Sequence, residues 1–183
     1  MSDLYQKKYK VNSLRLRNWD YGSEAWYCVT ICTHNFVHYF GKVEKGKMIL
    51  SEIGTLVLDY WLGIPKHFDF IKLDEFIIMP NHLHGILIIE NDNCKDDPLG
   101  RLKNQETRQW HVSTNKIRNW NQSLGLVLNQ FKGKCRRQCN QKNLTFSWQS
   151  RFYEHIIRSE KSLVKIRQYI QNNPLKWDLD EYC

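Results

Sequence analysis

The chain has 183 residues, 42% of them hydrophobic, which is enough to bury one core and too few for two independent domains of ordinary size. We therefore expect a single domain over residues 1–183. Lys and Arg outnumber Asp and Glu by 27 to 19, so the formal net charge is +8 and the surface should attract phosphodiesters. The chain lacks both an apolar run long enough to span a membrane and a signal-peptide pattern, so we expect a soluble, cytoplasmic protein without a membrane partner.

The first half of the chain predicts mostly strands. Residues 25–33 alternate and are rich in β-branched and aromatic side chains, which is typical of a strand. A hairpin with Gly46 at its turn should follow, and then a helix over residues 51–65 that stops at the proline. Residues 72–90 contain two apolar runs around a Met-Pro-Asn-His sequence, which predicts either a hairpin or one bent strand in the middle of a sheet.

The second half begins with a polar stretch at about 91–122, which we interpret as a surface insertion. Helical spacing resumes over residues 123–141, a short aromatic strand follows within 146–159, and a last helix should begin at Ser159 and end near Pro174. This order of elements predicts an α+β fold, a single antiparallel β-sheet with helices on one face.

A basic stretch lies at the end of the helix predicted over residues 123–141. Such a stretch either tracks a nucleic-acid backbone or forms a solvated helix face, and the pattern does not choose between them. Its members are Lys132, Lys134, Arg136 and Arg137. The six cysteines are expected to be free thiols, since none of them forms a CxxC pair and a cytoplasmic chain is kept reduced.

The His82-Leu83-His84 triplet is the first candidate site. Residues two apart on a strand project to the same face, so both imidazoles point one way and can share one divalent ion. A single histidine among apolar residues is more often a core residue. Two on one face favour a metal site.

Tyr169 and Asn173 form the second candidate, because residues four apart lie on the same face of a helix. A phenol attacks phosphorus only with help from a nearby metal or cation, and an amide oxygen one turn away is able to ligate that ion. A half-buried structural tyrosine is the alternative that these two residues leave open.

Four strings from residue 74 onward resemble the HUH-type single-tyrosine transposases, in particular the REP-associated tyrosine transposases. They are DEFIIMPNHLHGILII, SLGLVLNQFKGKCRR, WQSRFYEHIIR and IRQYIQNNPLKW, and two N-terminal strings, RLRNWDYGSEAWYCVTICT and LSEIGTLV, agree with them. The resemblance covers residues from about 14 to 177 in the same order, which we take as the core of the domain. Residues 91–122 match poorly.

The resemblance implies a ferredoxin-like or RRM-like HUH nuclease fold, with His82 and His84 as metal ligands and Tyr169 as the nucleophile. It implies Asn173 as a third ligand, where related insertion-sequence transposases carry Gln and many REP-associated ones carry Asn. The implied cofactor is Mg or Mn, the implied partner is single-stranded or hairpin DNA, and the implied reaction cleaves and rejoins DNA through a 5′-phosphotyrosine. The basic stretch would contact the DNA.

Three other functions remain open at this point. A replication initiator or relaxase shares the same site chemistry, and a domesticated HUH protein would bind repetitive hairpin DNA without cutting it. A structural metal-binding protein would need no tyrosine facing the metal. Relatives include monomers as well as homodimers, and the sequence does not decide between them.

Overall fold

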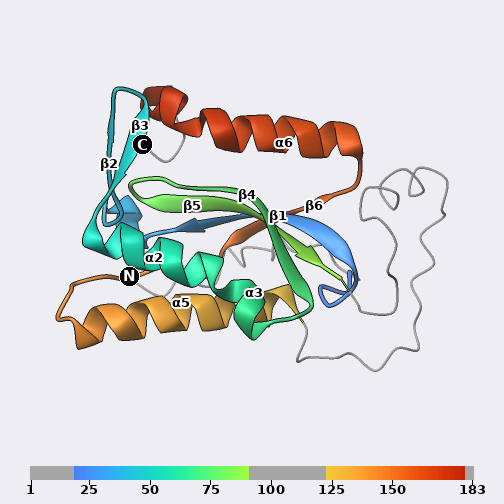
Figure 1. The fold of residues 1–183 in the computed structure, drawn as a ribbon, viewed down its shortest axis with the longest axis horizontal. Coiled ribbons are helices and arrows are strands. Elements are labelled where there is room, and N and C mark those ends of the chain that lie inside the picture. Colours follow the sequence, from blue (N-terminus) through green and yellow to red (C-terminus); the bar gives the residue numbers. More distant parts are fainter. Residues whose placement is uncertain (1–18, 91–122, 180–183) are drawn as a thin grey trace, which may run out of the picture.

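The computed structural model describes residues 19–90 and 123–179, so the predicted insertion at 91–122 lies outside the described residues. Its centre is a four-stranded antiparallel sheet in the order β4-β5-β1-β6 (Figure 1). The strands are β1 (Ala25–Cys32), β4 (Ile71–Ile78), β5 (His82–Ile89) and β6 (Tyr153–Ile157). Strands β4 and β5 form the hairpin that was one of the two alternatives for residues 72–90.

The predicted hairpin at Gly46 is confirmed as β2 (Gly41–Glu44) and β3 (Lys47–Leu50), which pair with each other outside the main sheet. Its turn residues Lys45 and Gly46 have φ values of 51° and 71°. Positive φ at both turn residues matches the right-handed twist of the strands they join, which is why glycine is favoured here. A short 3-10 turn, η1 (His34–Phe36), lies between β1 and this hairpin.

The three longest described helices begin after serines whose hydroxyls accept a hydrogen bond from a backbone N–H in the first turn, as the sequence predicts for Ser51 and Ser159. The helix predicted to stop at Pro65 ends three residues earlier, and Pro65 lies in the first turn of the next short helix, where its missing N–H costs nothing. The helical elements are α2 (Glu52–Leu62), α3 (Ile64–His67), α5 (Leu124–Gln141), α6 (Glu160–Asn172) and the 3-10 segment η4 (Asn173–Leu179).

The α+β class and the antiparallel sheet are confirmed, but the prediction that all helices lie on one face is wrong. Figure 1 shows α6 above the sheet and α2, α3 and α5 below it. Tyr27 and Leu87 belong to the core shared with α2 and α5, whereas their chain neighbours Trp26 and Ile86 pack with α6 residues. Strand β5 is buried at all eight positions, so it needs a cover on each face.

The larger core contains a close contact directly beneath the histidine pair. Trp61 of α2 is fully buried and packs against Gly85 of β5, where an added Cβ would lie 2.3 Å from Cζ2 of the indole. Gly85 therefore lets a large ring support the strand that carries His84. Within residues 19–90 and 123–179, no helix combines the length and apolar character that crossing a membrane requires.

Candidate metal and nucleophile site

The two histidines lie at the start of β5, on the face that α6 covers. His82 is fully buried and His84 is 3% exposed, and their ring centroids are 4.5 Å apart. The alternation predicted from the triplet is confirmed, because Leu83 between them points into the opposite core. Two imidazoles thus meet in one place on the sheet.

Hydrogen bonds fix how each imidazole presents its ring nitrogens. Nδ1 of His82 lies 2.8 Å from Oδ1 of Asn81, and because a carbonyl oxygen only accepts, Nδ1 carries the proton. Nδ1 of His84 lies 2.8 Å from Oγ1 of Thr30 on the neighbouring strand. With the proton on Nδ1, His82 has Nε2 as its acceptor, which is the state that a metal-ligating histidine needs. The Thr30 hydroxyl is able to accept from Nδ1 of His84 in the same way, although a hydroxyl can also donate.

Burial keeps the first of these imidazoles neutral. Removal from water, and next the neighbouring His84, lower the pKa of His82 to about 2. At neutral pH the ring is therefore uncharged, and a neutral imidazole is able to ligate a metal ion.

Tyr169 of α6 faces the second histidine. Its hydroxyl lies 3.2 Å from Nε2 of His84, and the two rings meet edge to face with centroids 5.2 Å apart. The side chain is 49% exposed. The phenol oxygen is thus both next to the candidate ligand atom and open to solvent.

Two contacts on either side of Tyr169 hold α6 in register with β4. Nε and Nη2 of Arg167 donate to Oδ2 of Asp74 at 3.0 and 2.6 Å, and Nε2 of Gln171 donates to Oε1 of Glu75 at 3.0 Å. Both acidic residues lie at a register irregularity of β4, which lets consecutive side chains reach the helix. The tyrosine is therefore positioned by residues two before it and two after it.

Asn173 lies one turn beyond the tyrosine and is 2% exposed. Four residues further on, Trp177 of η4 stacks on His82, with ring centroids 6.0 Å apart. The ring of Trp177 also meets that of His38, with centroids 5.6 Å apart. Asn173 is thus flanked in the chain by one residue that contacts His84 and one that contacts His82. The structure brings His82, His84 and Tyr169 together, and Asn173 begins η4 directly after α6.

The residues present suit a divalent ion, because imidazoles ligate divalent transition metals and the amide oxygen of Asn173 is a donor of the kind that Mg²⁺ and Mn²⁺ accept. Within the described part of the chain, no group of three His, Cys, Asp or Glu side chains forms a rival metal site. The cysteines at positions 28, 32, 135 and 139 are free thiols.

The comparisons with known proteins point to one family. An uncharacterized protein of Haemophilus influenzae is 38% identical over 171 residues, which cover 92% of this chain and 91% of that protein. A second protein of Haemophilus influenzae, named provisionally as a REP-associated tyrosine transposase, is 31% identical over 61% of this chain and 53% of its own length. Over part of its length, the chain is thus similar to a protein named as a REP-associated tyrosine transposase.

The fold agrees with this similarity. The solved structure of a REP-associated tyrosine transposase bound to a REP hairpin superposes with a TM-score of 0.58 at 14% identity, over 91% of this chain and 76% of that one. This chain and the solved transposase therefore share a fold. No protein-family model matches the chain.

The basic stretch of α5 does not lie with the tyrosine, since α5 covers the opposite face of the sheet (Figure 1). Nζ of Lys132 donates to the carbonyl oxygens of Gln149 and Arg151 at 2.7 and 2.8 Å, and lies 5.9 Å from the centroid of the Trp148 ring. Burial also lowers its pKa. Lys132 therefore supports a loop, while Arg136 and Arg137 are exposed.

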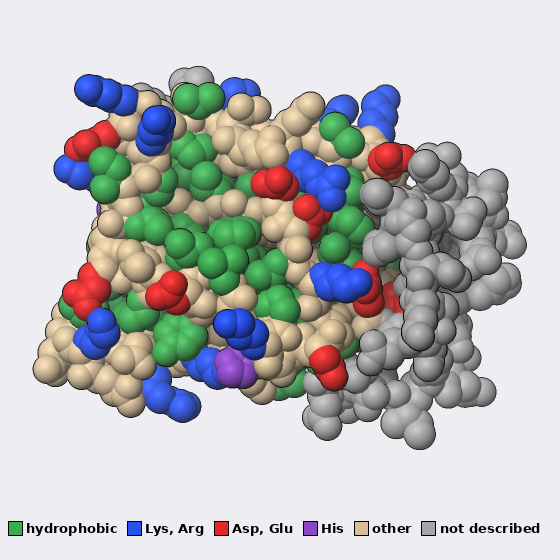
Figure 2. All heavy atoms as spheres, in the orientation of Figure 1, with side chains coloured by type: hydrophobic (Ala, Val, Ile, Leu, Met, Phe, Trp, Pro, Cys, Tyr) green, Lys and Arg blue, Asp and Glu red, His purple; other side chains and the backbone are tan. Residues whose placement is uncertain are grey.

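Figure 2 shows Lys and Arg side chains along α6 and the β2–β3 hairpin as well as on α5, so positive charge is not confined to the predicted stretch.

Four residues around the site are not singled out by the sequence patterns. Asn81 carries a weak signal, because it directly precedes the histidine pair. Thr30, Trp177 and His38 give none, since each reaches the site through strand pairing or chain reversal and not through local spacing.

Proposed function

We propose that this protein is a metal-dependent transposase that cleaves and rejoins single-stranded DNA at hairpin ends through a covalent bond to Tyr169. The observation that carries the proposal is the phenol oxygen 3.2 Å from Nε2 of His84, on a side chain that is 49% exposed. A nucleophile must be close to its activating group and open to substrate.

The reaction balances without any energy-rich cofactor. The Tyr169 oxygen loses its proton to solvent and attacks phosphorus, the bond to the 3′-oxygen of the preceding nucleotide breaks, and that 3′-oxygen takes a proton from solvent. The products are a 5′-phosphotyrosyl DNA and a free 3′-hydroxyl. Because one phosphodiester replaces another, a second 3′-hydroxyl is able to reverse the step and join strands.

His82, His84 and Asn173 would hold a divalent ion, Mg or Mn, that withdraws charge from the scissile phosphate and lowers the pKa of the phenol, which is near 10 when free. The protein's own share is positioning. Asn81 and Thr30 fix the imidazoles, and the contacts of α6 with β4 fix the tyrosine.

Hairpin DNA with an unpaired flank is the proposed substrate. The net charge of +8 suits a phosphodiester, and the similar solved transposase is bound to a REP hairpin. Since Tyr169 projects from a helix packed on a sheet, the scissile phosphate has to come to it, which an unpaired strand does more readily than a stacked duplex.

The test incubates the full chain with end-labelled hairpin oligonucleotides and Mn²⁺, and looks for a covalent adduct on a denaturing gel. We expect an adduct with the wild-type chain and none with Tyr169→Phe, which loses one hydroxyl and should keep DNA affinity within a few-fold. His82→Ala and His84→Ala should also abolish the adduct, and excess Mn²⁺ should not restore it.

Tyr153→Phe is the matched control, because Tyr153 is also an exposed tyrosine, on the same face of the sheet. An adduct that persists in Tyr169→Phe and disappears in Tyr153→Phe would move the nucleophile. Tight hairpin binding with no adduct under any metal condition would instead assign a binding function without catalysis.

A further inference from the structure

The segment η4 places an aromatic ring against one of the two candidate metal ligands. Trp177 stacks on His82, with ring centroids 6.0 Å apart and ring planes inclined by 30°. The imidazole is fully buried, and the indole is partly buried. A flat ring packed on an imidazole restricts the rotation of that imidazole about its Cβ–Cγ bond. Trp177 is therefore placed to fix the direction in which Nε2 of His82 points.

The two candidate ligands have different supports. His84 meets Thr30 at one ring nitrogen and Tyr169 at the other. His82 meets its chain neighbour Asn81 at Nδ1. A hydrogen bond tolerates a range of angles, so it restrains a ring plane less than a flat aromatic contact does. The stacked indole thus adds a restraint that the hydrogen bond to Asn81 does not supply.

Leu175 attaches η4 to the β2–β3 hairpin. A Cβ added at Gly46 would lie 2.6 Å from Cδ2 of Leu175, so the leucine side chain packs directly on the turn of the hairpin. Segment η4 also contacts β3, and Figure 1 shows the hairpin beside the C-terminal end of α6. Leu175 is 71% exposed, so burial of this side chain contributes little to stability. Its contact with the turn lies only two residues from Trp177.

The base of the hairpin is attached to the chain just before His82. The N–H of Phe40 donates to the carbonyl oxygen of Pro80 at 2.9 Å, and the N–H of Ser51 donates to the carbonyl oxygen of Phe40 at 2.8 Å. Phe40 is fully buried and directly precedes β2, and Ser51 directly follows β3. The hairpin therefore begins at a point fixed two residues from His82, and its turn reaches the same histidine through η4.

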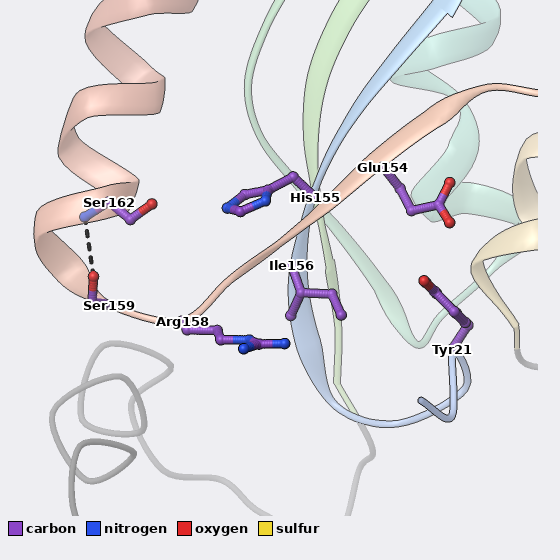
Figure 3. Close-up of a pocket in the computed structure, with 7 residues that line it drawn as sticks. All are labelled: Tyr21, Glu154, His155, Ile156, Arg158, Ser159 and Ser162. Atoms are coloured by element: carbon purple, nitrogen blue, oxygen red, sulfur yellow. Dashed lines mark hydrogen bonds between the residues drawn. The ribbon is translucent and has the colours of Figure 1, made fainter. Parts of the chain in front are cut away.

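The contacts that hold α6 do not themselves position η4. The hydroxyl of Ser159 accepts a hydrogen bond from the N–H of Ser162 at the start of the helix, beside the pocket at β6 (Figure 3). Arg167 binds Asp74 further along the helix. Both contacts act within α6, and η4 begins only after it, where the backbone changes to a 3-10 segment. The position of η4 therefore depends on contacts of its own.

We propose that Trp177 is a positioning residue for His82 and that the β2–β3 hairpin holds it in place through Leu175. The proposal rests on the proposed function, because it takes His82 as a ligand of the divalent ion. It gives a role to a hairpin that lies outside the main sheet. A change at the exposed Leu175 should then alter the metal site without touching it.

Titration of the DNA-free chain with Mn²⁺ measures the effect on metal affinity. Trp177→Ala should lower the affinity about 10- to 100-fold, as loss of a group that orients a ligating histidine does, and Trp177→Phe should retain most of it because a flat ring remains. Leu175→Ala should lower the affinity at least about 3-fold, a smaller loss because its contact is indirect. The matched control is Leu62→Ala, at an exposed leucine of α2, which covers the opposite face of the sheet (Figure 1).

Acylation by diethylpyrocarbonate tests the contact without any metal. The reagent modifies an imidazole nitrogen that is unprotonated and reached by solvent, and mass spectrometry of the tryptic peptide 73–95 locates the modified histidine. His82 should react slowly in the wild-type chain and several-fold faster in Trp177→Ala and Leu175→Ala, but not in the control variant. The exposed His67 of α3 is the internal reference, because its rate should be the same in every variant.

Unchanged Mn²⁺ affinity and unchanged acylation of His82 in both Trp177→Ala and Leu175→Ala would overturn the proposal. A lower urea midpoint without those two effects would also overturn it, because the contact would then only stabilise the fold. Equal effects in Leu62→Ala would refute it as well. An effect in Trp177→Ala alone would remove the hairpin from the proposal.

This proposal and the proposed function fail separately in these experiments. An adduct at Tyr169, with Mn²⁺ affinity and acylation unchanged in the variants, would leave the transposase and remove the positioning role. Lower affinity and faster acylation in the variants, without an adduct in the wild-type chain, would keep the positioning role and remove the catalytic function. A wild-type chain that binds neither Mn²⁺ nor Mg²⁺ would overturn both.

Discussion

Thr30→Val tests whether the imidazoles are held for metal binding. Thr30 lies on β1, and its hydroxyl is 2.8 Å from Nδ1 of His84. Valine has nearly the same shape and suits a strand equally well, so the substitution removes one hydrogen bond and leaves the packing in place. Without this partner, the proton of His84 is no longer held on Nδ1, and the ring can turn its protonated nitrogen toward the site.

The expected effect is on metal affinity and not on the fold. Loss of an outer partner of a ligating histidine lowers metal affinity about 10- to 100-fold, which corresponds to about 1.4 to 2.7 kcal/mol. The assay is calorimetric titration with Mn²⁺, together with adduct formation at low and saturating Mn²⁺. If the defect is in affinity, saturating Mn²⁺ should restore most of the adduct yield.

Thr55→Val is the matched control. The Thr55 hydroxyl also donates one hydrogen bond, to the carbonyl oxygen of Ser51, but it lies at an exposed position of α2. It should leave Mn²⁺ affinity unchanged. Unaltered affinity and adduct yield in Thr30→Val would refute the reasoning, and so would an equal loss in Thr55→Val.

Three further predictions concern packing, pH and charge. Gly85→Ala should lower the free energy of unfolding by about 1 to 3 kcal/mol in urea, because its Cβ would lie 2.3 Å from Trp61; an unchanged midpoint would mean that the ring shifts freely. Burial raises the pKa of Tyr27 to about 12, so the stability that depends on its neutral phenol is present below pH 10 and is lost as pH rises toward 12. Thermal unfolding against pH should show a shallower alkaline loss in Tyr27→Phe, and an identical slope would contradict this. Lys132→Gln should destabilise the fold by about 1 to 3 kcal/mol, since two carbonyl oxygens lose their donor. Gln at the other basic positions of α5 should leave stability unchanged and flatten the salt slope of DNA binding by up to about 2, and an unchanged slope would assign these residues to a solvated face. Those positions are Lys134, Arg136 and Arg137.

Local sequence was enough to predict most elements and the spacing of the candidate site residues. The alternation of β1, the turn at Gly46 and the serine caps of α2 and α6 depend on neighbours within a few residues, and the structure confirms them. The same holds for the two histidines on one strand face and for the tyrosine and asparagine on one helix face. These are consequences of the strand and helix periods, which any short segment carries.

The strand and helix periods do not predict which helix covers which face of the sheet. Because β1 and β5 are apolar on both sides, their alternation does not say which helix covers which face, and a fold with all helices on one face fits it equally well. One chemical clue pointed the other way. If Tyr169 is to meet His84, α6 has to lie on the histidine face, opposite the core that receives Leu83.

The sequence alone therefore determined which residues are able to act: a pair of imidazoles, a phenol and an amide, each set by local spacing. Tertiary structure decided how they are held. The Thr30 hydroxyl lies 54 residues from the imidazole it orients, and Asp74 lies 93 residues from the arginine that fixes α6. No local pattern encodes such contacts, because strand pairing and the packing of α6 on β4 create them only once the whole sheet has formed.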